Sequence, residues 1–189
     1  HRVYNHDTVG VIVRGGEVLN ERTRKSGSKG WPPLDTAAFF PDGSMRVFES
    51  AEHTGEEYLA MGAENVLAFG PWLVRGGEIN PALETAYRTK EPRTAIGMIE
   101  PYHYVALFVE GRVKRSGGVP VRWLAERMAE LSAVEAINLD GGKTSCLLFM
   151  GTKISSSNPD GLVRDGRSVS GMIGLGESDL VPAWEGLDK

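Results

Sequence analysis

The chain has 189 residues, of which 41% are hydrophobic and 24% are charged, and its formal net charge at pH 7 is −4. This composition is typical of a globular domain with a substantial core, so we expect residues 1–189 to form a single domain. The acidic balance argues against a general nucleic-acid-binding protein, which would present a basic patch or stripe.

Four stretches of the sequence have the form of a β-hairpin, with a polar, glycine-containing turn between β-prone runs. They are VIVRGGEVLN (11–20), FFPDGSMRVF (39–48), WLVRGGEIN (72–80) and LFVEGRVKRS (107–116). Glycine supplies the positive φ that tight hairpin turns require. These units predict an α+β fold with a twisted, mainly antiparallel or mixed sheet built from hairpins, on which at least two helices pack.

Two segments are expected to form those helices. HTGEEYLAMG (53–62) contains a capping box, with Thr54 as N-cap and Glu57 three residues later, and Gly62 ends it. The second helix is expected over 120–132, since proline suits a first helical turn. Apolar residues recur at helical spacing along it and are expected to pack in the core: Val121, Leu124, Ala125, Met128 and Leu131.

The second half of the chain is expected to alternate strands with this helix. Strands are predicted over 93–99, 102–110, 136–139 and 146–150. Asp140 therefore follows the carboxyl end of an apolar strand, and loops at strand ends often carry sites on a rigid scaffold.

The stretch AINLDGGKTSCLLF (136–149) holds the densest set of chemical groups. Between its apolar runs lie an acid, two glycines, a cation and two hydroxyls: Asp140, Gly141, Gly142, Lys143, Thr144 and Ser145. Paired glycines let a ligand approach the backbone and leave amides to face an anion. The same pattern is also typical of an Asp-Gly hairpin turn, so both interpretations stay open.

Two arginines precede apolar runs and are candidate ligands for an anion. Arg93 stands in EPRTAIG, and Arg167 stands in DGRSVSGMIG. An alternative for Arg93 is a surface ion pair with Glu91 or Glu100. The planar guanidinium matches phosphate oxygens in a bidentate way, which favours arginine where phosphate is recognised.

Several other kinds of site are not expected. The one cysteine, Cys146, rules out an intrachain disulfide framework. The four histidines are scattered along the sequence, and there is no P-loop or dinucleotide-binding fingerprint. We therefore expect no metal and no other cofactor, and no apolar run reaches the length of a membrane span.

Taken together, five motifs resemble the phosphodiester glycosidase family, which includes the uncovering enzyme. They are LAFGPWLVRGGEI (67–79), PRTAIG (92–97), FVEGR (108–112), AINLDGG (136–142) and GRSVS (166–170). The resemblance covers about residues 9–175. The family usually has a third glycine and a serine where this chain has Lys143 and Thr144. Its domains also usually begin with a strand and an Asn-Gly-aromatic segment, so we expect this chain to lack that amino-terminal part.

The resemblance implies hydrolysis of a phosphoglycan or sugar-1-phosphodiester substrate, with Arg93 and Asp140 as catalytic residues. Asp140 would act at the anomeric carbon as nucleophile, base or electrostatic stabiliser. The residues implied to bind substrate are Gly70, Gly141, Gly142, Thr144, Ser145 and Arg167. A non-catalytic module that binds a glycan or phosphoglycan in a cell-envelope protein is the alternative. Relatives indicate the cell envelope or secretion, and the cytoplasm is also compatible.

Overall fold

The computed structural model describes residues 2–3, 7–8, 10–21, 34–150, 152–155 and 173–174. Within these residues, two five-stranded sheets and two small two-stranded pairs are formed, and all strand pairs are antiparallel. The α+β class expected from the sequence is confirmed. The strands, however, are divided between two large sheets and not gathered in one.

The first sheet has the strand order β4-β3-β7-β5-β6. Its strands are β3 (Ile12–Arg14), β4 (Glu17–Asn20), β5 (Asp35–Phe39), β6 (Met45–Phe48) and β7 (Asn65–Phe69). The second sheet has the order β11-β10-β12-β8-β9. Its strands are β8 (Trp72–Arg75), β9 (Glu78–Ile79), β10 (Arg93–Glu100), β11 (His103–Val109) and β12 (Glu135–Asn138). The small pairs are β1 (Arg2–Val3) with β2 (Asp7–Thr8), and β13 (Leu148–Phe149) with β14 (Thr152–Lys153).

Three of the four predicted hairpins form, as β3-β4, β5-β6 and β8-β9. The prediction for LFVEGRVKRS was wrong, because β11 pairs with β10 and ends at Val109. The reason is close packing: a Cβ on Gly111 would lie 2.7 Å from the backbone nitrogen of Pro92. The chain therefore turns back toward the start of β10 and forms only a short bridge between Val113 and Ser116.

Helix α1 (Gly55–Ala60) begins as the sequence predicts. The Thr54 side chain accepts a hydrogen bond from the amide of Glu57 (3.2 Å), and the Glu57 carboxylate accepts one from the amide of Thr54 (2.8 Å). Both bonds of the capping box are therefore present. The helix ends at the C-cap Met61, just before Gly62 with φ +87°.

Helix α2 (Val121–Glu130) buries four of the five predicted apolar residues: Val121, Leu124, Ala125 and Met128. The fifth, Leu131, is 45% exposed because the helix ends before it, and this part of the prediction was wrong. No helix in the described part of the chain is both long and apolar enough to span a membrane.

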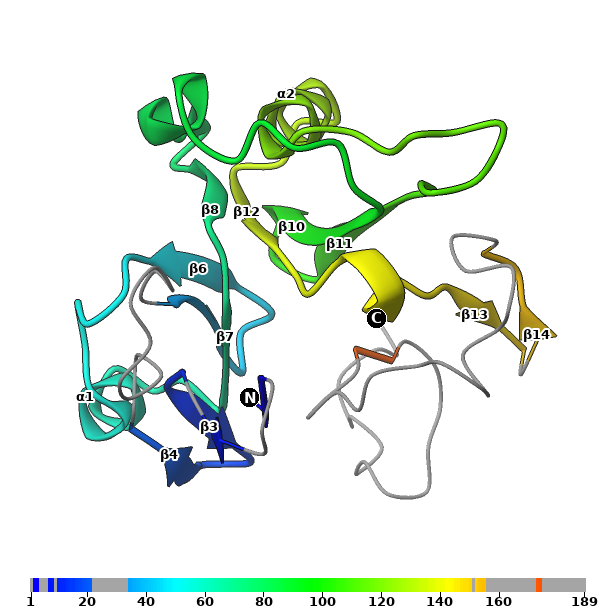
Figure 1. The fold of residues 1–189 in the computed structure, drawn as a ribbon. Helices are drawn as coiled ribbons and strands as arrows, with labels where there is room; N and C mark the ends of the chain where they lie inside the picture. The colour runs from blue at the N-terminus through cyan, green and yellow to red at the C-terminus, as the bar shows by residue number, and fades with distance from the viewer. Residues whose placement is uncertain are drawn as a thin grey trace, which may run out of the picture.

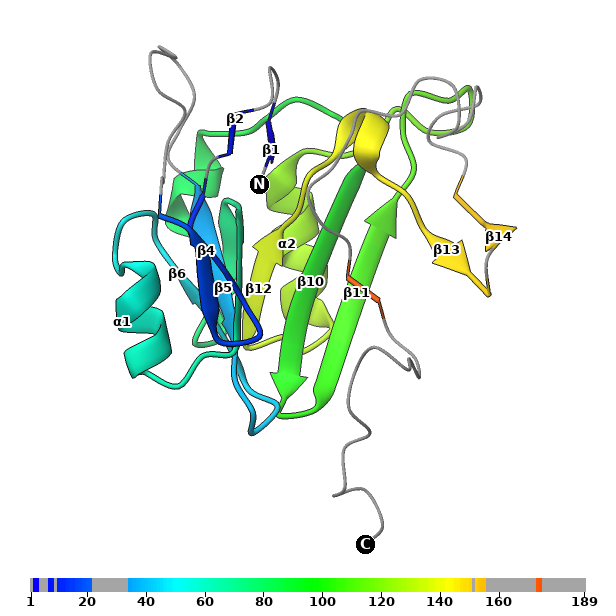
Figure 2. The ribbon, with the colours of Figure 1, turned by 90° about the horizontal axis from the view of Figure 1, so that it is seen from below.

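The two large sheets pack against each other, with one helix on each outer side (Figure 1 and Figure 2). Helix α1 packs on the first sheet through Tyr58, and α2 packs on the second through Leu124 and Met128. The core between the sheets consists of Ala37, Met45 and Val47 from the first sheet and Ile96, Met98 and Ile137 from the second. Consecutive residues of β5, Ala37 and Ala38, are both fully buried because both faces of that strand are covered.

One segment passes directly from the first sheet into the second. Strand β7 ends at Phe69 and β8 begins at Trp72, so only Gly70 and Pro71, joined by a cis peptide bond, separate them. Figure 1 shows the chain running through this connection from β7 to β8. Strand β5 begins beside it, with Asp35 opposite Phe69 in the register. This connection forms one side of the candidate site.

Candidate active site

The start of β10 and the end of β12 meet at one end of the second sheet. These strands are antiparallel neighbours, with Ala95 opposite Asn138. Beyond Asn138, the amide of Leu139 donates to the carbonyl of Thr94 (2.8 Å), and the amide of Gly142 donates to the carbonyl of Pro92 (2.9 Å). The sheet therefore brings the Arg93 segment and the loop that follows Asp140 together, although they are far apart in the sequence.

The loop after Asp140 is not a hairpin turn between two paired strands. Residues Gly142–Thr144 form a 3₁₀ turn, in which the Thr144 hydroxyl donates to the carbonyl of Gly141 (2.8 Å). The strand predicted over 146–150 is shorter, and β13 pairs with β14 and not with β12. The hairpin interpretation of Asp-Gly was therefore wrong.

The two glycines of this loop lie where side chains would collide with neighbouring groups. A Cβ on Gly141 would be 2.8 Å from the carbonyl oxygen of Pro92 and 3.8 Å from Cδ of Arg93. Gly142 has φ +66°, and a Cβ there would lie 3.2 Å from Nη2 of Arg112. Two arginines therefore flank the glycine pair.

Arg93 is half-buried and donates hydrogen bonds to backbone carbonyls. Its Nη2 donates to the carbonyl of Thr89 (2.9 Å), and its Nε donates to that of Val119 (3.4 Å). Burial lowers the pKa of Arg93, the nearby charge of Glu91 raises it, and that of Arg112 lowers it further. A half-buried guanidinium close to another cation is a favourable place for an anion.

The surface ion pairs considered for Arg93 do not form in the described part of the chain. Glu91 pairs with Arg112 instead, with its Oε2 2.6 Å from Nε. Glu100 lies 3.6 Å from Nδ1 of His103. Sequence reasoning did not select Arg112 as a site residue, although it ends the motif FVEGR (108–112). It reaches Gly142 only through the turn after β11, where its own φ is +58°.

A pocket of about 590 Å³ adjoins this end of the sheets. It is lined by Leu34, Asp35, Glu49, Ser50, Phe69, Gly70, Pro71, Trp72, Asn80, Ala82, Tyr87, Arg93 and Asn138. Two residues predicted for the site, Gly70 and Arg93, are among them. Asp140 lies two residues beyond Asn138, in the adjoining loop.

Asp35 is a pocket residue that no sequence motif marks. Its Oδ1 accepts a hydrogen bond from the amide of Ser50 (3.0 Å), and its Oδ2 accepts one from that of Trp72 (2.9 Å). Burial raises its pKa above the usual value, the two amides oppose this, and the charges of Glu49 and Glu52 add to the rise. Asp35 thus joins the first sheet to β8 and places a carboxylate in the pocket.

Several buried polar atoms near the site have no hydrogen-bond partner among the described residues. Asn138 donates from Nδ2 to the carbonyl of Gly70 (2.8 Å), but its Oδ1 has no partner. The same holds for Oγ of Ser50, Oγ1 of Thr94 and Oγ of Ser145. A buried polar atom left without a partner costs about 1–3 kcal/mol, so such a cluster calls for an explanation, and a bound ligand is one.

The remaining predicted site residues are placed as follows. Thr144 and Ser145 lie in the loop after Gly142, and a Cβ on Gly141 would be 3.8 Å from Oγ of Ser145. Arg167 lies outside the described residues. No group of three His, Cys, Asp or Glu side chains is placed to hold a metal ion in the parts of the chain that the structure describes.

Two antiparallel sheets thus place Arg93 beside the Asp-Gly-Gly loop. The sequence matches the profile described as "Phosphodiester glycosidase" over residues 2–175. The chain therefore belongs to the phosphodiester glycosidase family.

Two known proteins show how far the similarity extends. The SPbeta prophage-derived uncharacterized protein YomE of Bacillus subtilis is 28% identical over 163 residues, covering 85% of this chain and 24% of that protein. The zebrafish N-acetylglucosamine-1-phosphodiester alpha-N-acetylglucosaminidase catalytic domain, auto-inhibited by its pro-peptide, has a similar structure, with a TM-score of 0.63 at 19% identity. The alignment covers 80% of this chain and 52% of the zebrafish chain, and this likeness shows the fold. The chain thus spans about a quarter to a half of the length of these relatives.

Proposed function

We propose that this chain hydrolyses a sugar-1-phosphodiester, releasing the sugar and leaving a phosphomonoester. The observation that carries the proposal is the meeting of Arg93 with the loop after Asp140 beside a pocket of about 590 Å³. A volume of that size is within the range of small-molecule sites, about 300–1,000 Å³. Family membership supports the same class of reaction.

Arg93 is proposed to bind the phosphate. Two of its N–H groups donate to the carbonyls of Thr89 and Val119, which fix the guanidinium plane and leave its other N–H groups for a ligand. Arg112, which pairs with Glu91, stands on the other side of the glycine pair and adds a second guanidinium. Burial, and to a smaller extent the charge of Arg112, lower the pKa of Arg93, and an anionic phosphodiester between the two arginines would oppose both effects.

Asp140 is proposed to act at the anomeric carbon. The glycosyl C–O bond breaks, the electron pair leaves with the phosphate, and water supplies the new hydroxyl group on the sugar. A phosphomonoester has a second pKa near 6, so its departure needs little help from a general acid. A carboxylate suits the oxocarbenium-like transition state, either by direct attack, by taking the proton of water, or by charge stabilisation.

The other predicted residues complete this proposal. Gly70 keeps the pocket open next to Asp35, and Gly141 and Gly142 allow close approach to the loop. Thr144 and Ser145 would supply hydroxyl groups to the phosphate, and Arg167 would add a third guanidinium.

The experiment compares turnover of a sugar-1-phosphodiester by the chain and by two variants. Asp140→Asn should lower kcat roughly 100-fold or more, while Arg93→Lys should raise KM because lysine lacks the bidentate fork. Arg115→Lys is the matched control, since Arg115 pairs with Glu110 on the surface. Unchanged turnover in Asp140→Asn would remove Asp140 from the mechanism. Binding without any turnover by the unmodified chain would identify a phosphoglycan-binding module instead.

A further inference from the structure

We infer that the pocket between the two sheets holds the sugar against a wall of hydrogen-bond acceptors and selects an uncharged, hydroxyl-rich sugar over an acidic one. The wall consists of Asp35, Glu49, Ser50 and Asn138, all of which line the pocket. The inference rests on the proposed function for the identity of the ligand, a glycosyl phosphodiester, and for the position of its phosphate at Arg93.

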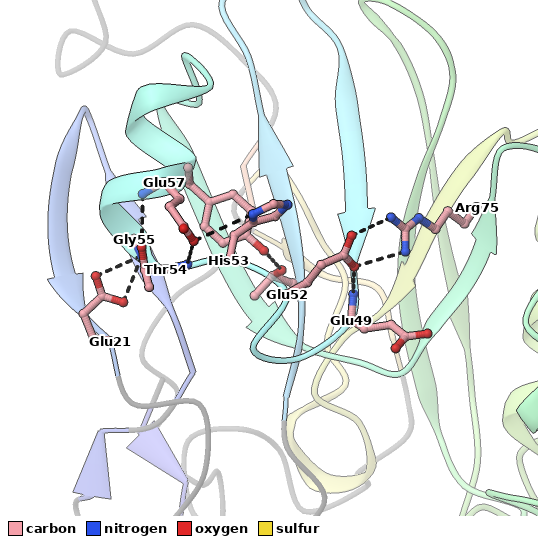
Figure 3. Close-up of polar contacts among 10 residues, drawn as sticks. Glu21, Glu49, Glu52, His53, Thr54, Gly55, Glu57 and Arg75 are labelled. Carbon is pink, nitrogen blue, oxygen red and sulfur yellow. Dashed lines mark hydrogen bonds and ion pairs between the residues drawn. The ribbon is translucent and has the colours of Figure 1, made fainter.

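Glu49 is the most accessible member of the acceptor wall. Glu49 is exposed, and its carboxylate has no hydrogen bond or ion pair among the described residues. Its backbone is nevertheless fixed, because its amide donates to Oε2 of Glu52 (3.0 Å). Glu52 in turn accepts two hydrogen bonds from Arg75, at 2.8 and 3.1 Å (Figure 3). The turn is thus held by Glu52 while the Glu49 carboxylate stays available to a ligand.

Asp35 places a second carboxylate close to the first. Both residues line the pocket, and the charge of Glu49 adds to the rise in the pKa of Asp35 that burial causes. Each Asp35 oxygen accepts one backbone amide and keeps lone-pair capacity for another donor. Because both groups accept hydrogen bonds, a ligand that contacts them must donate.

Two neutral members of the wall independently point to a ligand. Asn138 is only 2% exposed, lines the pocket, and has an Oδ1 without a partner among the described residues. The buried Oγ of Ser50 is in the same situation. A polyhydroxy sugar offers the hydroxyl donors that these atoms lack.

The two ends of the site differ in charge, and this difference orients the ligand. Arg93 lines the pocket with the charge of Arg112 nearby, whereas Asp35 and Glu49 line it with negative charge; Glu52, which also acts on Asp35, is paired with Arg75. A phosphate is therefore favoured at the arginine end, and a carboxylate on the sugar would face like charges at the other end.

Aromatic residues give the same pocket a surface for the apolar face of a sugar ring. Trp72 and Tyr87 both line it. Tyr87 has φ +54°, an uncommon backbone conformation for a bulky residue, and such residues cluster at ligand sites. An apolar surface combined with a few convergent polar groups is typical of small-molecule pockets.

The test compares two ligands that differ only at C6 of the sugar, the methyl phosphodiesters of glucose and glucuronic acid. Binding is measured by calorimetry on the Asp140→Asn chain, so that no ligand is consumed. We expect the glucose ligand to bind about 10-fold more tightly or better. Adding Glu49→Gln should reduce the ratio of the two affinities several-fold. Glu56→Gln removes the same charge from an exposed position on α1 and should leave the ratio unchanged.

The inference would be overturned by equal affinities, by tighter binding of glucuronic acid, by no binding of either ligand, or by equal effects of Glu49→Gln and Glu56→Gln. Turnover by the unmodified chain is measured separately. Discrimination in binding without turnover would reject the proposed hydrolysis and keep the acceptor wall. Turnover without discrimination between the two ligands would keep the proposed hydrolysis and reject the acceptor wall.

Discussion

Gly70 lies directly against Asp35: a Cβ built on Gly70 would be 2.8 Å from Cβ of Asp35 and 3.2 Å from its backbone nitrogen. The backbone of Gly70 also has φ +90°, where a side chain is strained. Glycine at this position therefore allows the connection between the two sheets to touch the start of β5. The pocket wall is built on that contact.

We expect Gly70→Ala to destabilise the protein by about 2–5 kcal/mol, combining the backbone strain with the overlap on Asp35. Gly62→Ala is the matched control, because Gly62 has φ +87° and open space around its would-be Cβ. It should cost only about 1–2 kcal/mol. Urea unfolding of both variants measures the difference, and equal losses would show that the overlap with Asp35 has no energetic weight.

Arg112 is expected to contribute to anion binding beside Gly142. Arg112→Ala should weaken the binding of inorganic phosphate about 5- to 10-fold, because one of two nearby positive charges is lost. Arg115→Ala removes a charge from the same turn, where Arg115 pairs with Glu110, and should have little effect. Calorimetric titration at low salt distinguishes the two variants. Identical affinities would exclude Arg112 from the site.

Tyr58 is expected to make stability depend on pH in the alkaline range. Burial raises its pKa from 10.0 to about 12, so the folded state keeps the proton longer than the unfolded state does. Its stabilising contribution is therefore complete below pH 10 and is lost as the pH rises through 12, by about 2–3 kcal/mol in total.

The Tyr58→Phe variant tests this dependence. It removes the hydroxyl that lies 2.6 Å from Oγ1 of Thr36, so it should be about 1–2 kcal/mol less stable near neutral pH. The difference from the unmodified chain should narrow between pH 10 and 12. Unfolding free energies measured at several pH values would contradict the assignment if the difference stayed constant.

The side-chain cap of α1 is expected to contribute about 1 kcal/mol to the free energy of unfolding. Thr54→Ala removes the side-chain acceptor for the amide of Glu57 and should lower stability by that amount. Thr54→Ser keeps the hydroxyl and should stay within a few tenths of a kcal/mol of the unmodified chain. Thermal unfolding followed by circular dichroism can resolve the two, and similar losses in both would point to packing of the Thr54 methyl group.

The features that the sequence predicted well depend on short stretches of chain. The capping box joins Thr54 and Glu57 three residues apart, and each hairpin that formed is closed by one glycine-containing turn. Arg93 and Asp140 could be selected because each lies in a motif with a recognisable composition. That they lie near each other depends on the pairing of β10 with β12, which local patterns do not specify.

The features that the sequence did not predict arise from contacts between distant segments. Asp35 lines the pocket because β5 begins beside the connection between the sheets, and Glu49 does so because Glu52 and Arg75 hold its turn. Arg112 reaches Gly142 from the turn after β11, where Gly111 packs on Pro92. The same contact explains why the fourth predicted hairpin does not form.

The passage of one chain segment from the first sheet to the second has a consequence for how this protein can diverge. The pocket beside Gly70 is lined by residues of both sheets, so its width depends on the distance between the sheets. That spacing is set by side chains sealed between them, such as Met45 and Ile137. Exchanging these for larger or smaller aliphatic residues would change the width of the pocket, so ligand preference could change through interior positions that do not line it.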